Sequence, residues 1–254
     1  MAELDRERSE IVERLDALEQ AAAEKAKQPT DTAAGVTMTS SAAAKIGLFR
    51  SLFRGREDVL PRRWENPKAG KAGYAPMCRN EWVRGVCGKP QVKCGECPNH
   101  AFVPIGDDIF RSHLAGKAAG SSADFTLGVY PMLPDETCWF LAADFDKKSW
   151  MHDVAAFRDT ARAKGVPIAI ERSRSGNGAH AWIFFAEPVS AADARRLGAV
   201  LITATMDRCP DIGFDSYDRF FPNQDTMPGG RVWQSDRPAA SKPASREGQQ
   251  RLSR

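Results

Sequence analysis

Residues 137–145 have the sequence TCWFLAADF, and this stretch decides the fold. It is a short, mainly apolar run that follows a Pro-Asp-Glu turn, a pattern typical of a buried β-strand. A similar run before the turn, FTLGVYPML at residues 125–133, predicts another strand. The regular part of the chain therefore begins near residue 125.

Helical and extended segments alternate after this strand. Ser149 and Ser190 can each cap the start of a helix with an apolar face. The remaining extended runs are VPIAIERS, AHAWIFF and DIGFDSY. The order from Thr137 is therefore β-α-β-β-α-β, which predicts an α+β fold of the split βαβ, or ferredoxin-like, type.

The composition is that of an ordinary globular protein. The 254 residues are 42% hydrophobic and 27% charged, which argues against a disordered, collagen-like or disulfide-stapled chain. No apolar run approaches the roughly 18 residues of a membrane span, and the N-terminus MAELDRERSE is too charged for a secretory signal. We therefore expect a cytoplasmic protein with no membrane partner. The net charge of +3 neither requires nor excludes a nucleic-acid partner.

Changes in composition divide the chain into five segments. Residues 1–26 predict an amphipathic helix, and residues 27–45, rich in Thr, Ser and Ala, predict a linker. Residues 46–124 combine a helical stretch with a loop-rich part that holds four cysteines, and residues 125–230 carry the regular strand and helix pattern. Residues 231–254 show no strand pattern.

Four of the six cysteines form a cluster with the spacing C-x8-C-x6-C-x2-C: Cys78, Cys87, Cys94 and Cys97. Four thiolates complete the tetrahedral shell of zinc, and a Cys-x2-Cys turn lets two of them face one ion. We expect one structural zinc ion here, with His100 as an alternative ligand. The competing interpretation is four free surface thiols. Basic residues outnumber acidic ones in this stretch, which suits either a phosphate backbone or a solvated face.

Asp144 and Asp146 stand two residues apart at the end of the strand at residues 137–145. Side chains two apart on a strand share a face, so both carboxylates are expected to converge there. Two like charges favour a divalent cation such as Mg²⁺ between them. The alternative is an ordinary strand end that turns through aspartate.

The turn in ERSRSGNGAHAWIFF carries the second group of candidate residues. Gly176 and Gly178 let the backbone approach a ligand closely, Ser175 and His180 flank the turn, and Arg172 adds positive charge. This combination favours a phosphate cradle. The competing interpretation is a polar hairpin with a structural histidine.

A third acidic group lies in FDSYDRFFPNQD, where Asp215, Asp218 or Asp225 could complete a carboxylate triad. An ordinary acidic loop explains the same spacing.

Taken in order, these motifs resemble the archaeo-eukaryotic primase superfamily. Within it, five short sequence motifs between about residues 45 and 230 are similar to the primase domain of TOTE conflict systems: LFRSLFRGREDV, CRNEW, FLAADFD, ERSRSGNGAHAW and DSYDRFFPNQD. The resemblance implies a catalytic core with a sheet like that of an RNA-recognition motif. It also implies template-directed polymerisation of NTPs or dNTPs on single-stranded DNA or RNA, with a helicase as a fused or separately encoded partner.

The resemblance also implies roles for individual residues. Asp144, Asp146 and a third carboxylate, for which Asp215 is preferred over Asp218, would hold two Mg²⁺ or Mn²⁺ ions. Ser175 and His180 would face the incoming triphosphate, and the four-cysteine part would contact the template or the initiating nucleotide. Two other classes stay open: a non-catalytic zinc-containing nucleic-acid-binding protein and a metal-dependent nuclease.

Residues 231–254 depart abruptly from the resemblance, and we expect a shifted reading frame there. If the first base of the Arg231 codon is skipped, the reading frame shifts by one base. The shifted codon at position 233 then consists of the last two bases of the Trp233 codon and the first base of the Gln234 codon, which is GGC and encodes glycine. Synonymous codons then allow GFGNLIALPLQ from residue 231, an apolar strand that the family resemblance leads us to expect. The sequence as it stands predicts a disordered tail, a missing strand and impaired activity.

Overall fold

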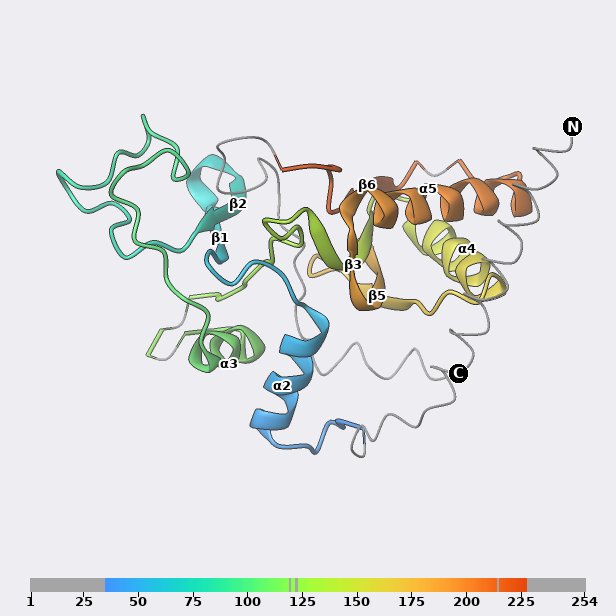
Figure 1. Ribbon diagram of the computed structural model, residues 1–254, viewed down its shortest axis with the longest axis horizontal. Coiled ribbons are helices and arrows are strands. Elements are labelled where there is room, and N and C mark those ends of the chain that lie inside the picture. Colours follow the sequence, from blue (N-terminus) through green and yellow to red (C-terminus); the bar gives the residue numbers. More distant parts are fainter. Residues whose placement is uncertain (1–34, 119, 122, 214, 228–254) are drawn as a thin grey trace, which may run out of the picture. The chain divides into compact units, whose positions relative to one another are not determined.

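The computed structural model describes residues 35–227 except 119, 122 and 214 (Figure 1). In the N-terminal part, its elements are α2 (Ala42–Leu52), β1 (Pro61–Asn66), the 3-10 helix η1 (Pro67–Ala69), β2 (Lys71–Pro76) and α3 (Asp107–Ala115). The C-terminal part contains β3 (Thr137–Phe145), α4 (Trp150–Ala163), β4 (Ala169–Arg172), β5 (Ala179–Ser190), α5 (Ala191–Arg208) and β6 (Tyr217–Phe221). All of these elements belong to one compact unit that begins at Ala42. The helix expected over residues 1–26 and the tail expected over residues 231–254 lie outside the described residues.

Four strands form an antiparallel sheet in the order β4-β5-β3-β6. Helix α4 connects β3 to β4, and α5 connects β5 to β6. The mixed α+β class predicted from the sequence is confirmed. None of the helices among the described residues is long and apolar enough to cross a lipid bilayer.

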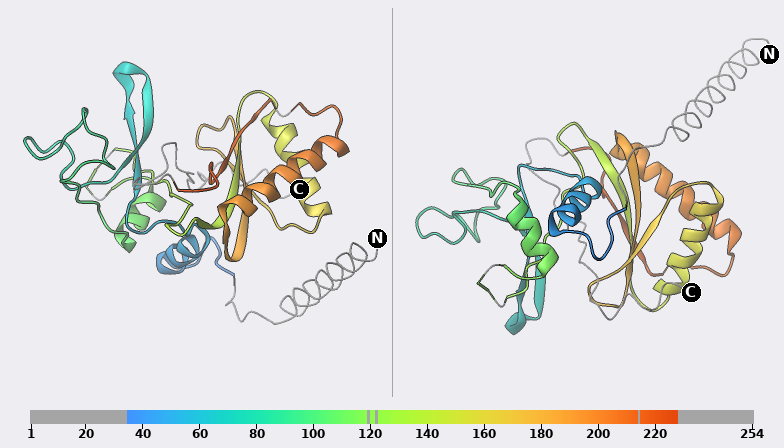
Figure 2. Two further views of the ribbon diagram at one scale, coloured as in Figure 1. Left: turned by 45° about the horizontal axis from the view of Figure 1, so that its top comes forward. Right: turned by 90° about the horizontal axis from the view of Figure 1, so that it is seen from below.

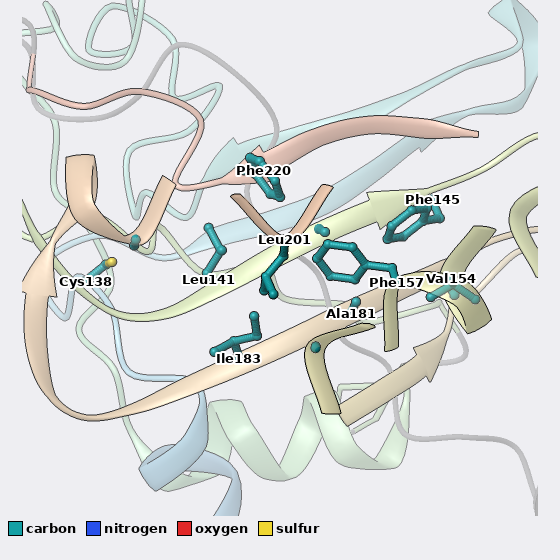
Figure 3. Packing of buried hydrophobic residues seen from close by; sticks show 13 residues of the cluster. Cys138, Leu141, Phe145, Val154, Phe157, Ala181, Ile183, Leu201 and Phe220 are labelled. Carbon is teal, nitrogen blue, oxygen red and sulfur yellow. The ribbon is translucent and has the colours of Figure 1, made fainter. Parts of the chain in front are cut away.

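One face of the sheet packs against α4 and α5. Alternate residues of β3, including Leu141 and Phe145, meet Phe157 of α4 and Leu201 of α5 in a fully buried core (Figure 3). Helix α5 approaches the sheet closely at Gly198, where an added Cβ would lie 2.6 Å from the Phe220 ring. The two helices therefore cover this face and leave the opposite face for other contacts.

The opposite face carries a second, aromatic cluster formed by Phe140, Ala142, Trp182 and Phe221. Phe53, just after α2, packs on it with its ring centroid 4.9 Å from that of Trp182. Figure 2 shows α2 on the side of the sheet opposite α4 and α5. Because side chains alternate along a strand, Asp144 shares this second face with Ala142.

The strand expected at residues 125–133 is absent, and this prediction is wrong. The segment is buried and apolar, but its hydrogen bonds go to a loop and to the start of β1: Arg56 N–H donates to Tyr130 O at 3.0 Å, and Gly128 N–H donates to Pro61 O at 2.9 Å. Pro131 lacks an amide hydrogen, which disfavours a ladder on that side. The segment is therefore buried and apolar but pairs with β1 only through the isolated bridge between Arg62 and Leu127.

The last strand begins later than expected. Residues 211–213, 215 and 216 of DIGFDSY are not a strand, and β6 starts at Tyr217. Asp218 is therefore on the strand, whereas Asp215 precedes it. The part of residues 46–124 expected to be loop-rich also contains β2, which pairs with β1 over six residue pairs.

Candidate active site

Asp144 lies near the end of β3, directly between two charged cross-strand neighbours. Its Cα partners in the antiparallel registers are His180 on β5 and Arg219 on β6. Burial raises the pKa of the Asp144 carboxyl above its usual range. The positive charge of His180 opposes this rise, while the negative charges of Asp218 and Asp146 add to it. The charges of Asp146 and Asp218 thus both act on the Asp144 carboxyl.

Asp146 is fixed through its backbone just beyond the end of β3. Its N–H donates to the carbonyl oxygen of Ser216 at 2.7 Å. The Ser216 hydroxyl donates to Oδ2 of Asp153 at 2.6 Å, and the Ser149 hydroxyl donates to the same oxygen at 2.8 Å. Asp153 is a buried residue of α4. The segment before β6 is therefore attached to both β3 and α4, a connection that sequence reasoning missed.

Strand β6 is irregular at Asp218. The β3–β6 register shifts between Asp144 and Phe145, whose partners are Arg219 and Tyr217. Asp218 is thus the extra residue of a bulge, a feature that changes the direction of side chains at a strand. Its Oδ2 accepts a hydrogen bond from Nε of Arg219 at 2.8 Å.

The other two acidic candidates have different surroundings. The backbone oxygen of Asp215 accepts a hydrogen bond from Nζ of Lys147 at 3.0 Å. The carboxylate of Asp225 accepts one from Nε of Arg195, on α5, at 2.6 Å. Of the three candidates, Asp218 is the one whose charge contributes to the raised pKa of the β3 carboxyl.

His180 is placed between two carboxylates. Its Nε2 lies 3.5 Å from Oδ1 of Asp144, and its Nδ1 lies 3.5 Å from Oε2 of Glu171 on β4. The side chain is 15% exposed. Burial opposes protonation, but contact with Glu171 and the charge of Asp144 together raise the pKa of His180. Sequence reasoning found His180 and missed Glu171.

The turn between β4 and β5 packs directly on the end of β3. An added Cβ at Gly178 would lie 2.5 Å from the carbonyl oxygen of Phe145, so no larger side chain fits without a shift. Gly176 has a φ of 78°, a conformation that favours glycine. The Ser175 hydroxyl accepts the N–H of Asn177 at 3.2 Å.

Two arginines stabilise this turn rather than point away from it. Nε and Nη2 of Arg172 donate to the carbonyl oxygen of Gly176 at 3.0 and 2.9 Å. Arg174 binds Glu65 of β1 and Asp124, with both N–O distances at 2.6 Å. Arg174 thereby connects the turn to the N-terminal hairpin.

The four clustered cysteines line one small cavity: Cys78, Cys87, Cys94 and Cys97. Burial raises the pKa of the Cys94 thiol, while the charge of Lys89 opposes this rise. His100 also lines the cavity, but its Nδ1 lies 2.6 Å from the carbonyl oxygen of Cys97 and its ring stacks on Phe102.

No group of three or more His, Cys, Asp or Glu side chains that could hold a metal ion is found within the described part of the chain. The donor types nevertheless suit the expected ions, with carboxylates around Asp144 for a hard cation and thiols in the cysteine cavity for zinc. The negative charges of Asp146 and Asp218 repel the buried Asp144 carboxylate, and a bound cation would reduce this repulsion.

The mixed α+β fold is consistent with a domain of the primase class. More particularly, a family model described as "TOTE conflict system, Archaeo-Eukaryotic Primase domain" matches residues 44–232, most of the chain. The chain belongs to this family, and membership indicates a nucleotidyltransferase-like role that involves nucleotides and nucleic acid. No curated protein matches the chain.

Proposed function

We propose that the protein is a primase-polymerase, which extends a primer with NTPs or dNTPs along a single-stranded template. The observation that supports the proposal is the contact between Asp144 and His180 at the end of the central strand β3, where the charges of Asp146 and Asp218 both add to the raised pKa of Asp144. The strand order β4-β5-β3-β6, with two crossover helices on one face, supports an RNA-recognition-motif-like catalytic core.

The three carboxylates would hold two Mg²⁺ or Mn²⁺ ions, and we propose Asp218 in place of Asp215 as the third ligand. Such ions, when bound, supply activation of the primer 3′-hydroxyl and charge stabilisation at the leaving pyrophosphate. His180 and Ser175 would then face the triphosphate, with Gly178 allowing close approach of the turn. Arg172 would act by shaping the turn, because its guanidinium already binds the Gly176 carbonyl.

These residues would contribute mainly through position and charge. Phosphoryl transfer asks for little covalent chemistry from the protein, so the alignment of the reacting groups dominates catalysis. Asp146 is attached to Ser216, and the β4–β5 turn packs on β3 at Gly178. These two attachments would fix the proposed metal ligands relative to the turn that carries Ser175.

We also propose that the cysteine cavity binds one structural zinc ion through Cys78, Cys87, Cys94 and Cys97. Residues 77–106 contain turns but no strand or helix, and all the core residues of the two hydrophobic clusters lie elsewhere. Metal binding would therefore supply much of the folding free energy of this part.

The cysteine part is the proposed contact for the single-stranded template. Trp82 is 66% exposed there, with Nζ of Lys89 5.5 Å from the centroid of its ring. Arg79, Arg84 and Lys93 of the same part are exposed as well. An exposed aromatic ring among cations suits a base that stacks while its phosphates bind the basic side chains. This surface also favours the second candidate function, a non-catalytic zinc-containing nucleic-acid-binding protein, and a helicase supplied by another chain would fit either function.

Residues from Arg231 are proposed to be out of frame, with a loss of catalytic efficiency as the result. Two observations support this. The family match ends at residue 232, and β6 pairs with β3 alone within the described residues, so that β6 has an edge on which another strand could pair. The shifted frame would encode an apolar strand in this region.

Primer extension tests the proposed function directly. A labelled primer on a single-stranded template is incubated with Mg²⁺ or Mn²⁺ and, separately, with NTPs and dNTPs. The assay uses both the present chain and a chain with the frame restored from residue 231. Asp144→Asn and Asp218→Asn should abolish extension, whereas Asp211→Asn, at an exposed position, should not.

Three results of this assay separate the alternatives. Extension by Asp144→Asn at the wild-type rate would overturn the catalytic assignment. Binding of template without extension by either chain would favour the non-catalytic function. Loss of extension in Asp215→Asn but not in Asp218→Asn would return the third position to Asp215.

A further inference from the structure

A single row of charged side chains crosses the whole four-stranded sheet. Glu171 on β4 is the Cα partner of His180 on β5, His180 is the partner of Asp144 on β3, and Asp144 is the partner of Arg219 on β6. Acidic and basic groups alternate along this row. The proposed chemistry uses Asp144 and His180, which leaves Glu171 without a role.

Glu171 is the polar group that faces the inner nitrogen of His180. Nδ1 of His180 is buried and has no hydrogen-bond partner within standard geometry among the described residues. The Glu171 carboxylate lies 3.5 Å from this nitrogen, which is long for a hydrogen bond and short enough for strong electrostatic attraction. The opposite nitrogen, Nε2, lies 3.5 Å from Asp144. The ring is therefore oriented by one carboxylate on each side.

Glu171 is itself held in place by Trp182. The indole Nε1 donates to Oε2 of Glu171 at 3.0 Å, the same oxygen that faces His180. Trp182 is 2% exposed and packs edge-on against Phe53 and in a stack on Phe184. A rigid indole thus fixes the carboxylate, because the aromatic cluster leaves the indole no freedom to rotate.

We propose that Glu171 is a positioning residue for His180: its carboxylate, anchored by Trp182, holds the ring so that Nε2 faces Asp144 and the nucleotide site. The inference rests on the proposed function only in assigning the triphosphate as what His180 meets. Outer-shell carboxylates that orient a functional histidine commonly change affinity by about tenfold to hundredfold when removed.

The variants are chosen to separate positioning from folding. Glu171→Ala removes the acceptor, and Glu171→Gln keeps an acceptor oxygen of the same reach. Trp182→Phe keeps the ring and removes the donor. Glu187→Ala, at an exposed position of β5, is the matched control. Circular dichroism melting shows whether each variant folds.

Two measurements are made on the full present chain. The first is the orientation of the His180 ring, from its ring-proton NMR signals. These are sensitive to the Trp182 ring 5.7 Å away and can be assigned with His180→Gln, since the chain has four histidines. The second is the dissociation constant of a non-hydrolysable nucleoside triphosphate in the presence of Mn²⁺.

Glu171→Ala should shift the His180 signals and weaken nucleotide binding about tenfold or more, and Trp182→Phe should do so more mildly. Glu171→Gln, which keeps an acceptor for Trp182 but loses the charge that attracts His180, should fall between Glu171→Ala and the wild type. A merely structural role would lower the melting temperature of Glu171→Ala and leave the signals of the folded protein unmoved, which would overturn the proposal. Wild-type His180 signals and wild-type affinity in Glu171→Ala would overturn it too. If neither the present chain nor the frame-restored chain binds nucleotide, the proposed function fails, but the NMR result still decides the role of Glu171.

Discussion

The hydroxyl of Ser216 donates a hydrogen bond of 2.6 Å to the buried carboxylate of Asp153. The backbone oxygen of the same serine accepts the N–H of Asp146 at 2.7 Å. One residue thereby attaches helix α4, the end of β3 and the start of β6 to each other. The position of Asp218, two residues later, depends on this attachment.

Ser216→Ala should lower the free energy of unfolding by ~2 kcal/mol, since it removes one of the two hydroxyl donors to a buried charge. It should also reduce nucleotide addition without abolishing it. Urea denaturation and primer extension measure the two effects. Ser112→Ala, which removes an exposed hydroxyl bonded to Asp108 O on α3, should change stability by less than about 0.5 kcal/mol. An equal effect of both variants would contradict this role for Ser216.

Asp144→Asn should stabilise the metal-free protein at pH 7 while it abolishes catalysis. Burial raises the folded-state pKa of Asp144, so its ionised form costs stability above that pKa, whereas the protonated form costs none below the ordinary value of 3.8. An asparagine, neutral at every pH, should therefore raise the melting temperature by a few degrees at pH 7. The gain should fade as the pH falls towards 3.8.

Melting curves recorded in the presence of a chelator at several pH values test whether Asp144→Asn raises or lowers the melting temperature. Added Mn²⁺ should stabilise the wild type and leave Asp144→Asn unchanged, because the variant lacks a charged ligand. Asp211→Asn is the control for a general loss of negative charge. A lower melting temperature for Asp144→Asn at pH 7 would show that the Asp144 charge is stabilising.

Much of this site follows from strand patterns that a sequence reveals. The apolar run before Asp144 and the run after His180 predict two strands, and a turn rich in glycine suggests that their ends meet. Glu171 could not be found in this way, because its relation to His180 depends on the β4–β5 register. Asp218 depends on a bulge, which has no signature in the alternation of apolar and polar residues.

The wrong strand at residues 125–133 has a similar cause. Phe125, Leu127 and Tyr130 are apolar because they are buried, and burial alone does not determine whether a segment pairs with a sheet. Likewise, Ser216 and Asp153 lie 63 residues apart, and nothing local in either stretch indicates their contact.

Cys87→Ser should release the proposed zinc ion and unfold residues 77–106 locally, with the four-stranded sheet intact. Loss of one thiolate opens a tetrahedral site whose binding energy would maintain this turn-rich part. Elemental analysis should find one zinc ion per wild-type chain and less in the variant. Hydrogen exchange should increase in residues 77–106 and stay low in β3 and β5.

Cys209→Ser is the matched control, since Cys209 follows α5 and does not line the cysteine cavity. It should retain zinc and the exchange pattern of the wild type. A wild-type chain without zinc after expression in zinc-supplemented medium would refute the metal assignment.

Trp82→Ala should weaken binding of single-stranded DNA by ~1–3 kcal/mol, the usual contribution of a stacked base, and leave the melting temperature nearly unchanged. Fluorescence anisotropy with a labelled oligonucleotide measures the affinity. Trp82→Phe should retain most of it. Val200→Ala truncates an exposed apolar residue outside the cysteine part, on α5, and should have no effect on binding. Equal affinities for Trp82→Ala and the wild type would remove Trp82 from the template surface.

Restoring the frame from Arg231 should increase primer extension, because the re-read codons would supply an apolar strand beside an edge of the sheet. Sequencing of the coding DNA checks the premise: with one base of the Arg231 codon skipped, it should spell GFGNLIALPLQ. A chain that stops after Gly230 is the matched control and should extend primers no better than the present chain. The restored chain should also melt at a higher temperature than both, since pairing on β6 buries backbone groups that are otherwise left to solvent. Codons that spell a different sequence in that frame, or a restored chain no more active than the control, would show that residues 231–254 are not a frame error.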